Sequence, residues 1–600
     1  MKTDKLKMLF TPKAILLIEY LCLVCAICIP NGCVYFFITG DWRWFSDIAS
    51  AMIIALPFVF LPPKWRVTSL IPIWGFVVFN ITNLWYLRFA NSMIPVPNYF
   101  LFGNFDTDLF RSGISMARPV DVVLVIPALL LTAAYLFKVF ERGNSVRFNI
   151  KSKVVVSVVS IMVFVVSEVV TEAQYNDAWS IEDLTPIVAE RYDTSKFRIS
   201  NSAEYCIDGC VTYILRGAAR PIIKRFKDKT LSEDELKIVE EYIDIHQRLV
   251  SQTPDSTERF SVNRDKNLIF IVVESLNAWS VAFEYGGHKL MPVLSELISG
   301  DGVISSVNVA SQVHSGVSSD GQFIYNTGLY PASDATTISC YLDNDLPTLA
   351  KVLRPRPSFE VICEGESLWN HDESNRAYGY DRLVSETDNR TYREGIGRDE
   401  AMFKTAGEII DTIAKPFYGM LITMSMHIPF TEDNVKMPQW ISDIPNQTEV
   451  MKHYLTATNY FDQCLGRFLD SLKEKGLYDN TVIAIASDHT APVDGSGYGA
   501  EYTDIVFAVL NSGMTLHSET PVGQVDVFPT LLQVMGRYNP QEYCGMGLSM
   551  LNPALKGSID KYSRVRGDAI SEQLDSMLRL SEQTSNLLLR ADKCMMTGLR

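Results

Sequence analysis

Long apolar segments dominate the first 171 residues, whereas the rest of the chain alternates short apolar runs with polar stretches. The apolar segments span five ranges, 14–32, 47–63, 67–87, 121–139 and 153–171. Each is about as long as a helix must be to cross a ~30 Å hydrocarbon layer, the second being at the short end. The pattern therefore predicts an all-α transmembrane domain of five helices over residues 1–171.

The distribution of Lys and Arg predicts the orientation of these helices, because cytoplasmic loops carry the excess of positive charge. The N-terminal tail and the loops after the second and fourth segments are the basic ones: Lys2, Lys5, Lys7, Lys13, Lys64, Arg66, Arg142, Arg147 and Lys151. The intervening loops are poorer in basic residues for their length. We therefore expect the N-terminus inside and residues 172–600 outside the cytoplasm.

The region after the fifth segment has a different pattern. Residues 172–258 are polar and predict a helical connector, in which Ser232 and Glu235 form a capping box before an amphipathic helix to about Val250. Short β-rich runs then alternate with helical patterns such as 448–475; these runs are 268–273, 416–423, 481–486 and 504–510. This alternation predicts an α/β domain with a largely parallel sheet over residues 259–550.

Residues 551–600 form a tail with an amphipathic helix expected over 570–589. Packing on the preceding domain is favoured for this helix, with contact to the membrane surface as the alternative. Elsewhere, two pairs of cysteines are candidates for disulfides in an extracytoplasmic domain, Cys206 with Cys210 and Cys340 with Cys363. Spacing alone does not decide either pair.

Length and charge narrow the class of protein. A chain of 600 residues is too long for one compact domain. Its formal net charge of −15 argues against nucleic-acid binding, which needs a basic surface to neutralise phosphates. The hydrophobic fraction of 47% is high for a soluble protein and agrees with the transmembrane segments.

The ends of two predicted strands carry metal-binding side chains. The first strand runs into Glu274, and the strand at 481–486 runs into Asp488 and His489. In parallel sheets, sites form at the carboxyl ends of strands. Carboxylate and imidazole groups suit zinc, manganese or magnesium-like ions, although a Glu after a strand is more often a turn residue.

A third segment, residues 311–323, is rich in hydroxyl groups and glycine before it continues into a helical pattern. A Ser at a helix N-terminus has its developing alkoxide favoured by free N–H groups, and a metal ion lowers its pKa further. The simpler interpretation is the N-cap of an ordinary helix. With Glu274, Asp488 and His489 elsewhere in the chain, a nucleophilic Ser is the better interpretation. His314, nearby in the chain, is a candidate for a supporting contact.

Several motifs now form a recognisable series: Val273-Glu274-Ser275-Leu276, Gly316-Val317-Ser318-Ser319-Asp320, Leu368-Trp369-Asn370, Met426-His427-Ile428-Pro429-Phe430 and Ser487-Asp488-His489. In content and order they resemble the lipoteichoic acid synthase family. Its members are phosphoglycerol transferases within the alkaline phosphatase and sulfatase superfamily. Five transmembrane helices before an alkaline-phosphatase-like α/β domain also match that family.

The resemblance implies specific roles. Glu274, Ser318, Asp488 and His489 would hold one divalent ion, commonly manganese, with magnesium or zinc as alternatives. Ser318 would be the nucleophile and form a covalent phosphoester, and His427 would contact the transferred phosphoryl oxygens. Further substrate-binding positions implied by the resemblance are Trp369 and His371.

The chain also departs from the family pattern. The family nucleophile is usually Thr, so Ser319 is an adjacent alternative to Ser318. His371 stands where an Arg is usual, and Glu364 or Glu366 stands where a His is usual, so fewer fixed positive charges would meet the substrate. The Cys/Ser-x-Pro-x-Arg motif of sulfatases is not found near Ser318, which argues against sulfate ester hydrolysis.

These observations predict a metal-dependent transferase in a bacterial cytoplasmic (inner) membrane. It would move a phosphoglycerol-type head group from a phospholipid donor to a glycan or glycolipid acceptor. A phosphoethanolamine transferase and a phosphodiester or sulfuric ester hydrolase of the same superfamily are the alternatives. An inactive membrane-anchored binding protein is the alternative from a different class.

Overall fold

The computed structural model describes residues 11–40, 45–90, 93–94, 96–100, 113–146, 150–176, 205, 209–219, 229–255, 257–333, 336–385, 395–493, 504–543 and 545–594. The chain divides into two compact units. One comprises Met1–Val96 and Met116–Ile223, and the other comprises Pro97–Ser115 and Lys224–Arg600. We call them the helical unit and the catalytic unit.

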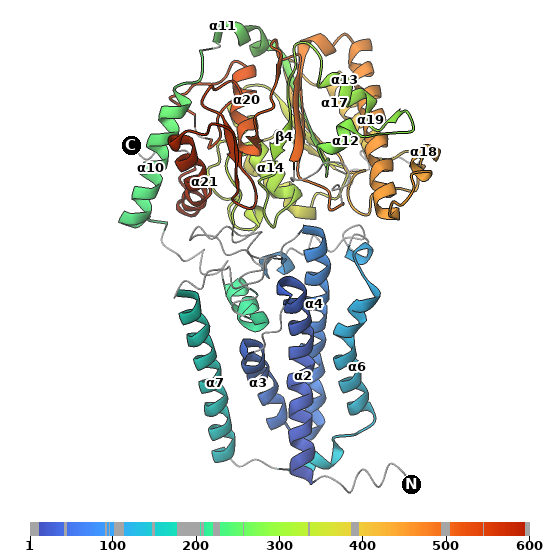
Figure 1. Ribbon diagram of the computed structural model, residues 1–600, viewed down its shortest axis with the longest axis vertical. Helices are drawn as coiled ribbons and strands as arrows, with labels where there is room; N and C mark the ends of the chain where they lie inside the picture. Colours follow the sequence, from blue (N-terminus) through green and yellow to red (C-terminus); the bar gives the residue numbers. More distant parts are fainter. Residues whose placement is uncertain are drawn as a thin grey trace. The chain divides into compact units, whose positions relative to one another are not determined.

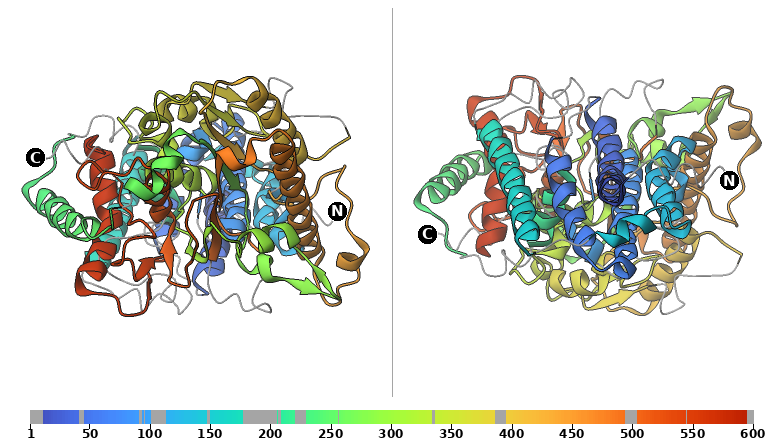
Figure 2. Two further views of the ribbon diagram at one scale, coloured as in Figure 1. Left: turned by 90° about the horizontal axis from the view of Figure 1, so that it is seen from above. Right: turned by 90° about the horizontal axis from the view of Figure 1, so that it is seen from below.

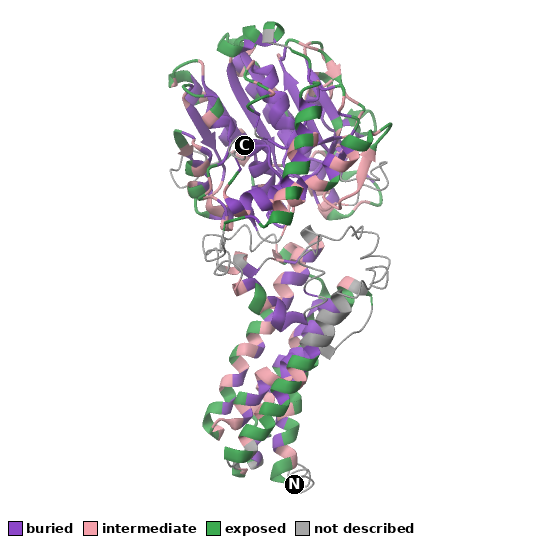
Figure 3. Ribbon diagram, turned by 90° about the vertical axis from the view of Figure 1, so that its left-hand side faces the viewer, coloured by how far each residue is buried: buried purple, intermediate pink, exposed green. Residues whose placement is uncertain are grey.

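The helical unit is built from apolar helices that lie side by side (Figure 1). Their bounds are α2 Pro12–Thr39, α3 Phe45–Phe60, α4 Leu70–Ala90, α6 Val122–Leu136 and α7 Ile150–Asn176, with a 3₁₀ turn at Pro63–Ser69 before α4. Large apolar side chains such as Leu17, Leu130 and Val155 are exposed. Figure 3 shows exposed positions along the length of these helices. Such faces are expected of helices surrounded by lipid rather than water.

Three stretches in the described part of this unit are long and apolar enough to cross a membrane: Pro12–Ile38, Pro63–Arg88 and Pro119–Leu136. The apolar stretches Asp47–Phe60 and Lys153–Ser167 are shorter than a full span. The apolar helices are therefore confirmed, whereas the count of five crossings stays a prediction. Both shorter stretches lie in helices that coincide with predicted segments.

The catalytic unit contains a nine-stranded mixed sheet in the order β10-β4-β9-β8-β1-β7-β5-β6, with β11 paired to β4. The strands of this sheet are β1 Asn267–Val273, β4 Ile304–Ala310, β5 Ser358–Val361, β6 Arg382–Val384, β7 Tyr418–Ile422, β8 Thr481–Ser487, β9 Asp504–Leu510, β10 Leu516–His517 and β11 Val522–Gly523. Strands β8, β1, β7, β5 and β6 run parallel, and β9 is antiparallel to both neighbours. The predicted largely parallel sheet and its four predicted strands are confirmed.

Helices cover both faces of this sheet (Figure 1). The longer ones are α10 Glu233–Val250, α14 Ser318–Thr327, α16 His371–Tyr378, α17 Arg398–Thr412, α19 Glu449–Glu474, α20 Val527–Val534 and α21 Glu572–Ala591. Short helices are α11 Thr257–Phe260, α12 Trp279–Ala282, α13 Pro292–Leu297, α15 Leu349–Val352 and α18 Gln439–Ser442. Two small hairpins complete the unit, β2 Glu284–Tyr285 with β3 His288–Lys289, and β12 Gly557–Ile559 with β13 Val565–Gly567.

Local sequence signals explain where the long helices begin. The Ser232 hydroxyl accepts from the amide of Glu235 and the Glu235 carboxylate accepts from the Ser232 amide, so the predicted capping box before α10 is confirmed. The hydroxyls of Thr448 and Ser571 cap α19 and α21 in the same way.

The predicted amphipathic helix of the tail is α21, and it packs on the catalytic unit. Leu574, Met577, Leu578 and Leu588 on its inner face belong to the same buried core as strands β1 and β8. Helix α10 lies beside it (Figure 2). The Arg590 guanidinium donates two hydrogen bonds to Glu235, of 2.8 and 2.6 Å, across this helix pair.

Of the two candidate disulfides, the structure describes both cysteines of only one pair. Cys340 and Cys363 are both thiols, so the candidate disulfide between them does not form. The Cys363 thiol instead donates to the backbone carbonyl of Arg398. Cys210 is a buried thiol, and Cys206 lies outside the described residues.

Candidate active site

Two neighbouring strand ends assemble a cluster of three metal-binding side chains. Strands β1 and β8 are adjacent and parallel, with Val273 opposite Ser487. The residues that follow, Glu274 and Asp488-His489, therefore emerge at the same edge of the sheet. Their ligand atoms all lie within 4.8 Å of one another, and all three residues are buried.

The hydroxyl of Ser318 points into this cluster. Its Oγ lies 3.1 Å from Oε2 of Glu274 and 3.0 Å from Nε2 of His489. Ser318 is the first residue of α14, whose N-terminus therefore faces the cluster. The structure thus brings together four residues that are far apart in the chain.

Glycine allows α14 to approach this closely. A Cβ atom at Gly321 would lie 2.7 Å from the carbonyl oxygen of Asp488 and 2.9 Å from its Cβ atom. Real Cβ atoms do not tolerate contacts of this kind. Gly321 therefore lets the first turn of α14 pack directly against the strand end that carries Asp488 and His489.

The backbone just before Ser318 is strained. Val317 has a φ of +48°, which is costly for a β-branched residue. The buried carboxylate of Asp320 holds this turn by accepting from the amides of His314 (3.0 Å) and Gly316 (2.9 Å). This turn leads directly into Ser318, whose hydroxyl lies in the cluster, and Asp320 stabilises the loop that bears it.

The adjacent hydroxyl points elsewhere. Ser319 is buried, and its Oγ donates to the carbonyl of Gly316 at 2.9 Å. Of the two neighbouring serines, Ser318 is therefore the one whose hydroxyl contacts the acidic and imidazole groups.

Burial and mutual charge shift the ionisation of the cluster. Burial on its own would raise the pKa of Glu274, but the charge of His489 and its hydrogen bond, together with smaller contributions from His427 and Asp488, lower that pKa below its usual range. Burial and then the charge of Glu274 raise the pKa of Asp488 well above its usual range. Burial would lower the pKa of His489, yet Asp488 and Glu274 raise it to about 9.

The donor set fits a divalent cation. Two buried carboxylates face one imidazole, so the cluster is short of positive charge. Oδ1 of Asp488 accepts from the amides of Ser275 (2.8 Å) and His489 (2.7 Å), whereas its buried Oδ2 has no hydrogen-bond donor. A buried carboxylate oxygen without a donor is costly unless a cation contacts it.

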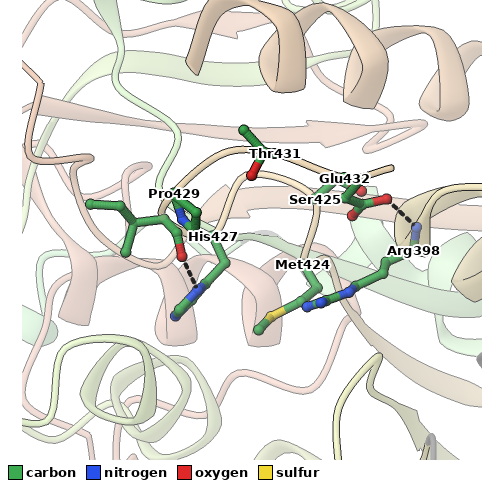
Figure 4. A pocket seen from close by; sticks show the side chains of 8 residues that line it. Arg398, Met424, Ser425, His427, Pro429, Thr431 and Glu432 are labelled. Atoms are coloured by element: carbon green, nitrogen blue, oxygen red, sulfur yellow. Dashed lines mark hydrogen bonds between the residues drawn. The ribbon is translucent and has the colours of Figure 1, made fainter. Parts of the chain in front are cut away.

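A pocket lies beside the cluster in the loop after β7 (Figure 4). It is lined by Arg398, Met424, Ser425, His427, Ile428, Pro429, Thr431 and Glu432. The ring of His427 and the guanidinium of Arg398 lie on either side of Met424. The charge of His427 also contributes to lowering the pKa of Glu274, so this imidazole acts electrostatically on the cluster.

The loop that carries His427 is fixed from α17. Oδ1 of Asp399 accepts from the amides of Met424 (2.8 Å) and Ser425 (2.9 Å). At the start of the loop, the Thr423 hydroxyl accepts from the amide of Glu274 at 3.0 Å. The His427 loop and the Glu274 strand end are thus directly hydrogen-bonded.

The two remaining candidate residues lie in a separate segment. Trp369 is partly exposed and has a φ of +49°. His371 is 1% exposed, and its Nε2 lies 2.5 Å from Oε1 of Glu364. Glu364 and His371 both depart from the family pattern, and the structure shows that they are direct partners of each other.

Comparison with known protein families accounts for both units. The Lipoteichoic acid synthase N-terminal domain model matches residues 37–182, and the Sulfatase model matches residues 266–537. The chain is 23% identical over 517 residues to lipoteichoic acid synthase 2 of Bacillus subtilis, covering 82% of this chain and 75% of the relative. The chain is a lipoteichoic acid synthase-like protein with a Sulfatase-type domain.

Other similarities agree with this assignment. Lipoteichoic acid synthase of Staphylococcus aureus is 29% identical over 329 residues, which span 51% of this chain and about half (50%) of that relative. The lipooligosaccharide phosphoethanolamine transferase A of Neisseria meningitidis shares the fold, with a TM-score of 0.51 at 13% identity over 87% of this chain and 96% of that one. Together the lipoteichoic acid synthase relatives point to a phosphotransferase.

Within this site, three contributors have no role assigned from the sequence, although Asp320 stands in the Gly316-Val317-Ser318-Ser319-Asp320 motif. They are Asp320, Gly321 and Asp399, which hold the loops and the helix around Ser318 and His427. Asp320 and Gly321 follow Ser318 in the helical pattern, where an acidic residue and a glycine carry no signal of long-range contact. Asp399 lies at the start of α17, where an acidic residue is normally explained by the helix dipole.

Proposed function

We propose that this protein is a membrane-bound, metal-dependent transferase that moves a phosphoglycerol-type head group from a phospholipid to a glycan or glycolipid acceptor. The observation that carries the proposal is the position of the Ser318 hydroxyl, 3.1 Å from Glu274 and 3.0 Å from His489. A hydroxyl at a helix N-terminus, inside a cluster of metal-binding groups, is the arrangement of an activated nucleophile.

Glu274, Asp488, His489 and the Ser318 oxygen would hold one divalent ion, for which manganese is the first candidate and magnesium or zinc the alternatives. A bound divalent ion would stabilise negative charge on the Ser318 oxygen and on the phosphoryl group. The donor-free Oδ2 of Asp488 and the excess of carboxylate over imidazole support this assignment.

In the first half-reaction, Ser318 Oγ attacks the phosphorus of the phospholipid. The Oγ–P bond forms, the bond from phosphorus to the diacylglycerol oxygen breaks, and that oxygen takes up a proton as Ser318 loses one. In the second half-reaction, an acceptor hydroxyl attacks the same phosphorus and releases Ser318, which regains a proton. His427 would contact the phosphoryl oxygens, and Trp369 and His371 belong to the segment proposed to receive the head group.

The helical unit would keep the chain beside its lipid substrate. We propose five crossings with the N-terminus in the cytoplasm and the catalytic unit outside it. The lipoteichoic acid synthase N-terminal match over residues 37–182 and the three long apolar helices support a membrane anchor of this kind. In a bacterium the donor lipid and the acceptor would then meet at the outer surface of the cytoplasmic membrane.

The test is mass spectrometry of full-length protein in detergent, incubated with Mn²⁺ and either phosphatidylglycerol or phosphatidylethanolamine. The expected result is a glycerophosphoryl adduct on the Ser318 peptide, absent in Ser318→Ala and retained in Ser319→Ala. A phosphoethanolamine adduct would instead assign the alternative donor. An adduct that persists in Ser318→Ala would show that the nucleophile is another residue.

A further inference from the structure

The loop that precedes Ser318 is bound both by helix α14, which follows it, and by helix α21 near the end of the chain. Nε2 of His314 lies 2.5 Å from Oε1 of Glu582 on helix α21, and both side chains are largely buried, at 14% and 6% exposed. The amide of the same His314 donates to Asp320 at 3.0 Å. His314 is therefore fixed at its backbone by α14 and at its side chain by α21.

Helix α21 also contacts the chain on the far side of α14. The Ser585 hydroxyl donates to the carbonyl of Tyr330 at 2.7 Å, and the Asn586 side-chain oxygen accepts from the amide of Ser333 at 3.1 Å. Tyr330 and Ser333 follow shortly after the end of α14 at Thr327. One turn of α21 thus holds the segments before and after the helix that presents Ser318.

The segment just before α21 adds to the same support. The carbonyl of Ile559 accepts from the side-chain amide of Gln312 at 2.8 Å, and the amide of Lys561 donates to the carbonyl of Ser311 at 2.9 Å. Residues 311, 312 and 314 are therefore all bound by residues between 559 and 582. These contacts come from a region beyond residue 537, where the match to the Sulfatase model ends.

Packing alone does not explain a Glu at this position. The apolar side chains of Leu574, Met577, Leu578 and Leu588 already bury the inner face of α21. Glu582 is 4% exposed, and burying a carboxylate is unfavourable unless it is paired. An apolar side chain would pack the helix at lower cost, whereas this carboxylate places an oxygen 2.5 Å from the His314 ring.

We propose that Glu582 is a positioning residue that acts through His314 to hold the Ser318 loop in its strained conformation. It does not touch the reacting atoms, and its effect is on the placement of the Ser318 oxygen. The inference rests on the proposed function of Ser318, and it extends the active site to a helix outside the recognised catalytic region. Small displacements of a nucleophile are costly, since misplacement by ~1 Å can reduce a rate by ~100-fold.

The experiment compares Glu582→Ala and Glu582→Gln with Glu572→Gln, a change at an exposed position of the same helix. Full-length protein in detergent is followed by head-group transfer and by hydrogen exchange of the amides of residues 311–317. We expect Glu582→Ala to lower kcat by at least about tenfold with KM within about twofold, and to speed exchange of the loop. Glu582→Gln keeps an acceptor for His314 and is expected to recover most of the loss.

Hydrogen exchange needs no substrate, so the inference and the proposed function fail separately. If wild-type protein transfers no head group, the function fails, and exchange of residues 311–317 still decides the role of Glu582. Unchanged exchange and kcat in a folded Glu582→Ala protein would overturn the inference. Equal effects of Glu582→Ala and Glu572→Gln would do the same.

A second variant covers the case in which Glu582→Ala does not fold. His314→Ala removes the same contact from the loop side without altering α21. It is expected to reproduce the loss of kcat and the faster exchange of residues 311–317. Wild-type kcat and exchange in a folded His314→Ala protein would overturn the inference.

Discussion

The close approach of α14 to the end of β8 makes Gly321→Ala a sharp test of how the site is built. The added Cβ atom would lie 2.7 Å from the Asp488 carbonyl oxygen and 2.9 Å from the Asp488 Cβ atom. Neither neighbour is the end of a flexible side chain, so relief requires the helix or the strand end to move. Either movement separates Ser318 from Asp488 and His489.

The size of the effect follows from this geometry. A carbon atom normally keeps ~3.5 Å from such neighbours, so the helix must shift by close to 1 Å. Overpacking of a well-packed site costs about 1–3 kcal/mol of stability. A nucleophile displaced by ~1 Å loses about 100-fold in rate, which corresponds to about 2.7 kcal/mol in the barrier. Mn²⁺ affinity should fall as well, because Ser318 and the strand end contribute to the same proposed site.

Gly407→Ala on helix α17 is the matched control. Its Cβ atom would meet only the end of the Lys475 side chain, at 3.6 Å. This change is expected to be neutral or to stabilise by about 0.5–1 kcal/mol. Head-group transfer, Mn²⁺ titration by calorimetry and thermal unfolding are measured on both variants. Wild-type kcat and Mn²⁺ affinity in Gly321→Ala would refute the argument that this contact positions Ser318.

Three further outcomes are expected. Ser318→Thr keeps the hydroxyl and should retain adduct formation within about tenfold of wild type, measured on the Ser318 peptide. Mn²⁺ at about 100 times its Kd should stabilise wild-type protein by about 2.7 kcal/mol in thermal unfolding, and Asp488→Asn should lose most of this gain. Burial lowers the pKa of His246 to about 4, below the ~6.5 of a His in the unfolded chain. The free energy of unfolding is therefore unaffected by this residue above pH ~6.5 and decreases as the pH falls toward 4, because only the unfolded state takes up the proton. Between pH 7.5 and 5.5 the loss should be about 1.4 kcal/mol, and His246→Gln should remove it.

Much of the catalytic unit could be predicted because its signals are local. Strands β1, β7, β8 and β9 are short apolar runs, and each was expected at or within two residues of its observed bounds. The rule that sites form at the carboxyl ends of parallel strands predicts from the sequence alone that Glu274, Asp488 and His489 lie at one edge of the sheet. Strand β4 was not predicted, because its sequence, Ile-Ser-Ser-Val-Asn-Val-Ala, contains too many polar residues to form an apolar run.

The features that sequence reasoning missed depend on contacts between distant segments. The positive φ of Val317 contradicts the preference of a β-branched residue, so local propensity predicts the opposite conformation. The burial of His371 and its contact with Glu364 could not be predicted, because Glu364 lies in the loop after β5 and no local pattern pairs the two residues. In the sequence, Glu582 has the position of an ordinary polar residue of an amphipathic helix. Only the fold shows that it lies against His314.

The position of α21 in the chain also has a consequence for biosynthesis. Its hydrogen bonds with Tyr330 and Ser333 join residues more than 250 positions apart in the sequence. At a synthesis rate of ~5–20 residues per second, α21 emerges tens of seconds after the loop it supports. During that interval the strained turn at Val317 lacks its outer support. A chain interrupted before α21 would reach the membrane with Glu274, Asp488 and His489 present and the Ser318 loop unsupported, so that partial products of translation would be poor enzymes.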